Sequence, residues 1–73
     1  MLVQQIGEDI KQRRKALKIT QPDLAELAEV STNTIYKIER GQANPTIDVI
    51  EKIALILGLE LKLEIRKTTT KPD

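Results

Sequence analysis

The chain has 73 residues, with 12 Lys and Arg against 11 Asp and Glu, which gives a formal net charge of +1. It contains no Cys, His, Trp or Phe, so disulfides, thiolate metal sites and His- or Cys-based catalysis are excluded. We therefore expect one domain without a metal, a cofactor or enzymatic activity. No apolar run approaches the ~20 residues of a membrane-spanning helix, and no signal-peptide pattern is visible. These features predict a soluble, cytoplasmic protein.

The first predicted helix covers residues 3–18, where Ile6, Ile10 and Leu17 recur at helical spacing and are expected to face inward. Its second half is rich in basic residues, which either form a solvated helix face or attract a negatively charged polymer. These residues are Lys11, Arg13, Arg14, Lys15 and Lys18.

Residues 20–28 are predicted to form a second, shorter helix. Thr20 is a suitable N-cap, and Asp23 follows three residues later, which is the spacing of a capping box. Pro22 falls in the first turn, where a missing backbone N–H is tolerated.

A third short helix is predicted over residues 32–40, between the N-cap Ser31 and Gly41, a residue type that commonly ends helices. Ile35 and Ile38 share its inward face. Its outward face carries side chains suited to base edges and phosphates in a DNA major groove. These residues are Thr32, Asn33, Tyr36 and Lys37.

After a loop at residues 42–45, a fourth helix is predicted from its N-cap Thr46 to Gly58. Apolar residues occupy most of its circumference, so more than one of its faces must be buried. In so small a domain, we expect the second face to meet another subunit.

Residues 59–66, LELKLEIR, alternate apolar and charged side chains, which is typical of a β-strand. The sequence offers no second strand, so we expect this segment to pair antiparallel with its copy in a homodimer. Centring the pair on Leu63 brings opposite charges face to face. The alternatives are a further helical turn past Gly58 or a strand that serves another protein. The expected interface side chains are Leu59, Leu61, Leu63 and Ile65.

The stretch QPDLAELAEVSTNTIYKIERG, residues 21–41, resembles the helix-turn-helix of phage-repressor/Cro-like (XRE-type) regulators. Gln21, Leu24-Ala25, the cap Ser31 and the ending Ile38-Glu39-Arg40-Gly41 carry this resemblance, which extends over about residues 6–59. One departure is Glu29, which stands where members of the family usually have Gly and costs on the order of 1 kcal/mol in a left-handed turn.

The resemblance implies an all-α, lambda-repressor-like bundle of four to five short helices with a helix-turn-helix, to which the strand at 59–66 is added. Residues 1–66 would form the DNA-binding domain together with its dimerisation strand. Residues 67–73 are polar, and we expect a disordered tail.

The resemblance also implies roles for single residues. Arg14 would pair with Glu39 and tie the first helix to the recognition helix; the alternative is two independent surface charges. The residues implied to read base edges are Thr32, Asn33, Tyr36 and Lys37. Those implied to bind DNA phosphates are Arg13, Thr20, Gln21, Arg40, Gln42 and Asn44.

The residues alone leave other interpretations open for several of these side chains. Gln21 could be an ordinary solvated first-turn residue, and Thr32 and Asn33 could merely cap and solvate a helix start. Tyr36 could pack at the edge of the core instead of contacting DNA.

We therefore expect a dimeric, sequence-specific repressor that binds double-stranded DNA at a palindromic operator. The C-terminal alternation is similar to that of the HipB-like antitoxin branch of the family, which implies a kinase-like toxin as a possible second partner. The alternative is a protein-interaction module that keeps the fold without binding DNA, which the low net charge favours.

Overall fold

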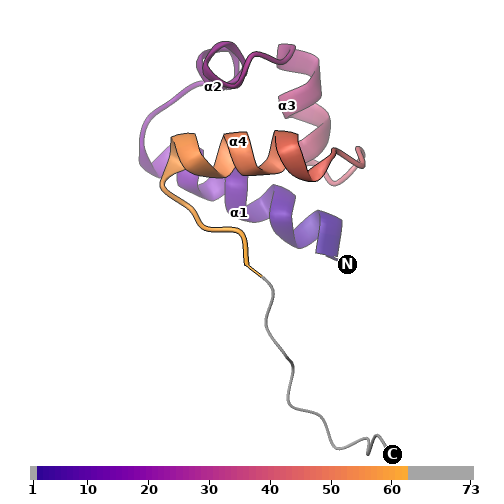
Figure 1. Cartoon of the computed structure of the whole chain (residues 1–73). Helices are drawn as coiled ribbons and strands as arrows, with labels where there is room; N and C mark the ends of the chain where they lie inside the picture. The colour runs from indigo at the N-terminus through magenta and orange to yellow at the C-terminus, as the bar shows by residue number, and fades with distance from the viewer. Residues whose placement is uncertain (1, 63–73) are drawn as a thin grey trace, which may run out of the picture.

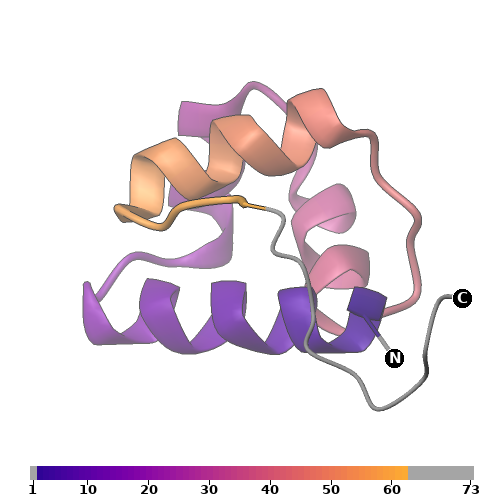
Figure 2. The same cartoon turned by 60° about the horizontal axis from the view of Figure 1, so that its bottom comes forward.

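The computed structural model describes residues 2–62, which form four α-helices around one core (Figure 1). Helix α3 packs against α1 and α2, and α4 packs against the same two helices. In Figure 2, α1 and α4 lie on opposite sides of the bundle, and α3 closes one end. The all-α prediction is confirmed for these residues. The helices are α1 (Leu2–Ala16), α2 (Gln21–Ala28), α3 (Thr32–Glu39) and α4 (Ile47–Leu57).

Side-chain caps set the starts of the last three helices. The hydroxyl oxygens of Thr20, Ser31 and Thr46 each accept a hydrogen bond from the backbone N–H three residues later, at 3.1, 3.0 and 3.2 Å. At the start of α2, the Asp23 carboxylate also accepts from the backbone N–H of Thr20 and completes a capping box. All three predicted N-caps are confirmed.

Each helix is followed within two residues by a residue in the left-handed backbone conformation, and two of these residues are not glycine. Lys18 follows α1 with φ 59° and Glu29 follows α2 with φ 60°, whereas Gly41 and Gly58 follow α3 and α4. After α2, the backbone N–H of Val30 donates to the carbonyl of Ala25 at 3.0 Å, as in a Schellman motif. The left-handed turn at Glu29 is therefore formed without the usual glycine.

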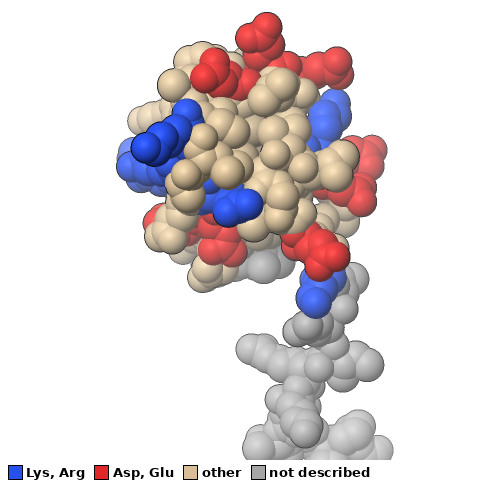
Figure 3. All heavy atoms as spheres, turned by 90° about the vertical axis from the view of Figure 1, so that its left-hand side faces the viewer, with Lys and Arg blue, Asp and Glu red and all other residues tan. Residues whose placement is uncertain are grey.

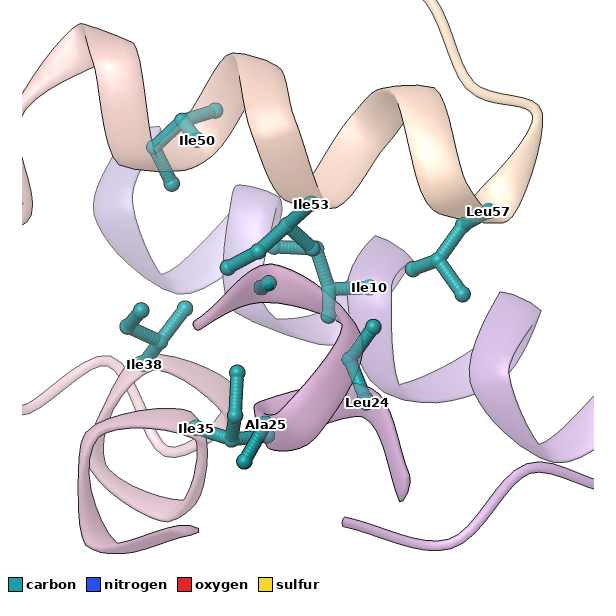
Figure 4. Packing of buried hydrophobic residues seen from close by; sticks show 9 residues of the cluster. Ile10, Leu24, Ala25, Ile35, Ile38, Ile50, Ile53 and Leu57 are labelled. Carbon is teal, nitrogen blue, oxygen red and sulfur yellow. The ribbon is translucent and has the colours of Figure 1, made fainter. Parts of the chain in front are cut away.

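The core is a single apolar cluster to which all four helices contribute, and Figure 4 shows its side chains pointing toward one another. Ile10 of α1 is buried and Ile6 is partly buried, as predicted. The inward placement of Leu17 is wrong: its side chain is 40% exposed because α1 ends at Ala16 and the chain then turns away. The buried cluster contains Ile10, Leu24, Ala25, Ala28, Ile35, Ile38, Ile50, Ile53 and Leu57.

The strand predicted over residues 59–66 is wrong for residues 59–62, which are the part of it that the structure describes. Residues 59–62 carry no strand and no helix, and no strand occurs within residues 2–62. The backbone N–H of Leu59 donates to the carbonyl of Ala54 at 2.8 Å. This residue therefore belongs to the C-terminal cap of α4 and does not begin a strand. A strand also needs a neighbour for its backbone groups, and residues 2–62 provide none. Residues 63–66 and the expected tail at 67–73 lie outside the described residues.

Within the described part of the chain, no helix is both long and apolar enough to cross a bilayer.

The backbone strain at Glu29 leads to a stability prediction. Glu29→Gly should raise the free energy of unfolding by up to about 1 kcal/mol, because glycine adopts the left-handed conformation without a Cβ clash. Glu29 is exposed and its carboxylate lies 3.6 Å from Lys52, a contact that contributes little to stability. Urea denaturation measures the change. Glu29→Ala, which removes the same carboxylate but keeps the strain, is the matched control and should lie close to the unsubstituted protein. Equal stability of the Gly and Ala variants would contradict the prediction.

Candidate nucleic-acid interface

The predicted recognition helix, α3, has one buried face and one exposed face. Ile35, Ile38 and Glu39 are buried against the rest of the bundle. The opposite face presents hydrogen-bonding and cationic groups to solvent, as a helix that enters a major groove requires. The four residues predicted to read bases are all exposed: Thr32, Asn33, Tyr36 and Lys37.

Five of the six predicted phosphate-binding residues lie at the start of α2 or just after α3. Thr20 and Gln21 begin α2, Arg40 is the C-cap of α3, and Gln42 and Asn44 lie in the loop before α4. The Gln21 side chain donates to the Glu39 carboxylate at the end of α3, which brings these two regions together. All but the half-buried Gln21 are exposed.

A buried ion pair at the base of α3 holds this surface in place. Arg14 Nε lies 2.6 Å from Glu39 Oε2, and a second guanidinium nitrogen donates to Glu39 Oε1 at 3.1 Å. The two residues are only 8% and 6% exposed. Arg14 also donates to the carbonyl of Ile19 at 2.8 Å, and Gln21 donates to Glu39 Oε1 at 3.0 Å. The expected Arg14–Glu39 pair is therefore present, and it is part of a larger network.

No buried side-chain nitrogen or oxygen among the described residues lacks a hydrogen-bond partner. Complete hydrogen bonding of these atoms matters for stability, because a buried charge destabilises the fold unless it is both paired and hydrogen-bonded. The network connects α1, the 17–20 turn, the start of α2 and the end of α3. It thus fixes the orientation of α3 relative to both helices that flank it.

A close backbone approach reinforces this connection. Helix α1 passes so near the end of α3 that a Cβ added at Gly7 would collide with the carbonyl oxygen of Ile38. Gly7 is therefore required at this contact for steric reasons, although it lies inside a helix, where glycine is unfavourable.

The structure gives Arg13 a contact that the sequence did not predict. Its Nε donates to the carbonyl of Leu57 at 2.7 Å, so the side chain caps the C-terminal end of α4. The carbonyls at a helix C-terminus lack partners within the helix and favour a positive charge nearby. One donor of Arg13 is thus used inside the bundle, and its phosphate contact stays a prediction.

A second unpredicted contact lies on the exposed face of α3. The Arg40 guanidinium carbon is 5.3 Å from the centre of the Tyr36 ring, within the range of a cation–π contact. The spacing of four residues on one helix was a signal for this contact, because such residues are neighbours on the helix surface.

Charge is distributed unevenly over the surface. Figure 3 shows a group of Lys and Arg side chains at the left of the view and Asp and Glu side chains along the top, although both signs also occur at the right and in the lower part of this face. The last turn of α1 contributes the exposed Arg13 and Lys15 to the surface charge. A near-neutral protein can still orient a polyanion through an uneven charge distribution of this kind.

The fold and the exposed, braced third helix define a helix-turn-helix domain. The Helix-turn-helix family (HTH_3) matches residues 10–63, and the chain belongs to this XRE-type family of DNA-binding regulatory domains.

Two relatives and one solved structure agree with this assignment. The chain is 36% identical over 64 residues to the immunity repressor protein of Bacillus phage phi105, a match that covers 88% of this chain and 44% of the repressor. The chain thus spans less than half of that protein. It is 39% identical over 51 residues to an uncharacterized HTH-type transcriptional regulator of Methanothermobacter thermautotrophicus, covering 70% of this chain and 74% of that protein. The crystal structure of the clp gene regulator ClgR from Corynebacterium glutamicum shares the fold, with a TM-score of 0.78 at 24% identity, over 81% of this chain and 63% of that one.

The buried network predicts a large cost when either charged partner is removed. Arg14→Leu or Glu39→Leu should each lower the free energy of unfolding by about 3–5 kcal/mol, because the remaining charge stays buried without its partner. The double variant should be more stable than either single variant, since no uncompensated charge remains. Denaturant unfolding of all four proteins provides the double-mutant cycle. Removing the exposed pair with Glu29→Ala is the control and should cost less than about 1 kcal/mol. Additive losses in the double variant would rule out this account of the pair.

Proposed function

We propose that this chain is a sequence-specific, double-stranded DNA-binding transcriptional repressor that reads a palindromic operator as a homodimer, with α3 in the major groove. The observation that carries this proposal is the exposed face of α3, held at a fixed orientation by the Arg14–Glu39–Gln21 network. A recognition element must be rigid to discriminate bases, and a buried, bidentate contact provides that rigidity.

The base-reading part of the proposal rests on side-chain chemistry at the exposed positions. The Asn33 amide can bind the N6 and N7 edge of adenine in a bidentate manner, and the Lys37 ammonium can donate to O6 or N7 of guanine. Thr32 offers a hydroxyl that can donate or accept, together with a methyl group suited to thymine. All three side chains are exposed along α3.

The phosphate-binding part depends on donors at the start of α2 and around the α3–α4 loop. At α2, Pro22 has no backbone N–H, and the N–H of Asp23 already donates to the Thr20 hydroxyl. Gln21 is therefore the proposed donor there, through its backbone N–H at the positive end of the helix dipole. The other residues proposed to bind DNA phosphates are Thr20, Arg40, Gln42, Asn44 and Arg13.

The dimer part is supported by apolar surface on α4 and beyond it. Ile47 and Leu55 are 71% and 80% exposed, and Leu61 is 44% exposed. We propose that two copies meet through the apolar side chains that follow α4, among them Leu59 and Leu61. The pairing about Leu63, with Ile65, that the sequence predicts falls on residues outside the described part of the chain. An open groove beside Leu59 and Leu61 would receive side chains of the partner. It is lined mainly by apolar residues: Ile6, Ile10, Ile50, Ala54, Leu59 and Leu61.

The antitoxin role is a narrower version of the same proposal, and it rests only on the resemblance of residues 59–66 to the HipB-like branch. A kinase-like toxin would then be a second partner of the dimer. Purification of the chain together with the product of a neighbouring gene would support this role. A chain that binds such a protein but no duplex DNA would instead be an interaction module.

Operator selection tests the DNA-binding proposal. From a random duplex library, the protein should enrich a palindrome with half-site centres about 10 base pairs apart, and binding should weaken as salt rises. Asn33→Ala should then cost about 1–3 kcal/mol on the selected operator and change the preferred base at one position. Asn44→Ala, the matched change in the loop, should weaken binding to all duplexes without altering the preferred sequence. An unchanged base preference in the Asn33 variant would show that this side chain does not read DNA.

The dimer is tested by a charge placed at its proposed interface. Leu61→Glu should convert the dimer to a monomer, because each interface would then bury two additional carboxylates close to the two-fold axis. Sedimentation equilibrium measures the change. Leu27→Glu, at a more exposed apolar position on α2 outside the proposed interface, is the control and should remain dimeric. A monomeric unsubstituted protein, or a dimeric Leu61 variant, would refute this interface.

A further inference from the structure

Tyr36 and Arg40 form a cation–π pair on the exposed face of α3. The guanidinium carbon lies 5.3 Å from the ring centre. Tyr36 is 45% exposed, and Arg40 is also exposed at the C-cap of the helix. Within the described residues, this cation–π contact is the one polar interaction recorded for the Arg40 guanidinium.

The cation–π contact leaves the binding capacity of Arg40 intact. Among the described residues no hydrogen bond or ion pair uses the Arg40 guanidinium, so its five N–H donors remain available to a ligand. The ring also restricts a long side chain that otherwise carries about 2 kcal/mol of rotamer entropy. Restricting such a side chain before binding lowers the ordering cost of the complex.

We propose that Tyr36 is a positioning residue, which acts on DNA by holding the Arg40 guanidinium toward a phosphate oxygen and does not read a base itself. This inference rests on the proposed function and changes the role first expected for Tyr36. A phosphate is the target because Arg40 lies at the C-terminal end of α3, directly before the loop with Gln42 and Asn44. The planar fork of Arg also matches two phosphate oxygens.

The test compares Tyr36→Phe, Tyr36→Leu, Arg40→Ala and the double variant Tyr36→Leu/Arg40→Ala. Binding is measured on the selected operator and on a random duplex of equal length, at several salt concentrations. Tyr36→Phe keeps the ring and should bind as the unsubstituted protein does. Tyr36→Leu should weaken binding about two- to fivefold on both duplexes, as expected for loss of an exposed cation–π contact. The preferred operator sequence should not change.

The Arg40 variants test whether Tyr36 acts through Arg40. Arg40→Ala should weaken binding to both duplexes and reduce the salt slope by about 1, which corresponds to one lost phosphate contact. The double variant should bind as Arg40→Ala does, because a ring without its guanidinium has nothing to position. Circular dichroism on each variant checks that α3 is intact, and the exposure of both side chains favours folded variants.

Three results would overturn the inference while leaving the proposed function in place. They are a changed base preference in Tyr36→Leu, a binding loss in Tyr36→Phe as large as in Tyr36→Leu, and losses that multiply in the double variant. An unsubstituted protein that enriches no duplex would instead refute the proposed function, and this inference with it.

Discussion

The buried Arg14–Glu39 pair is the constraint on which the geometry of the candidate interface depends. Both side chains are almost fully buried, so each needs the other to offset the cost of leaving water. An apolar pair of similar volume could stabilise the bundle equally well, but it would tolerate more than one packing angle between α1 and α3. The bidentate geometry, with Gln21 and the Ile19 carbonyl as further partners, restricts this angle, because a changed angle would break these hydrogen bonds. Orientation of the recognition helix is therefore the property that the pair provides.

Much of this architecture could be predicted from the sequence, because it depends on local hydrogen bonds and on periodicity. Thr20, Ser31 and Thr46 cap their own helices, and the apolar spacing predicts which residues fill the core. Leu17 was wrongly predicted to face the core because the apolar periodicity continues one residue past the end of α1. A left-handed residue at Lys18 ends the helix there, without the glycine that would have marked the boundary.

The parts that could not be predicted depend on contacts between distant segments. Arg13 and Leu57 are 44 residues apart, and only the packing of α1 against α4 brings the side chain to the carbonyl. The Arg14–Glu39 pair was expected only because of the family resemblance, since a spacing of 25 residues carries no physical signal. The predicted strand at 59–66 depends on a partner strand, which residues 2–62 do not supply.

The net charge of +1 limits how such a domain can bind DNA. General attraction to phosphates is weak in a near-neutral protein, so affinity must come from a few cations and amides in fixed positions. Lys37 and Arg40 are the cations on the exposed face of α3, and the Tyr36 ring holds one of them in place. A two-fold dimer would double these contacts on a palindrome but not on random sequence, where only one half-site would fit. Low charge and rigid placement together would favour specific over non-specific binding, and the proposed dimer would add affinity for a palindrome.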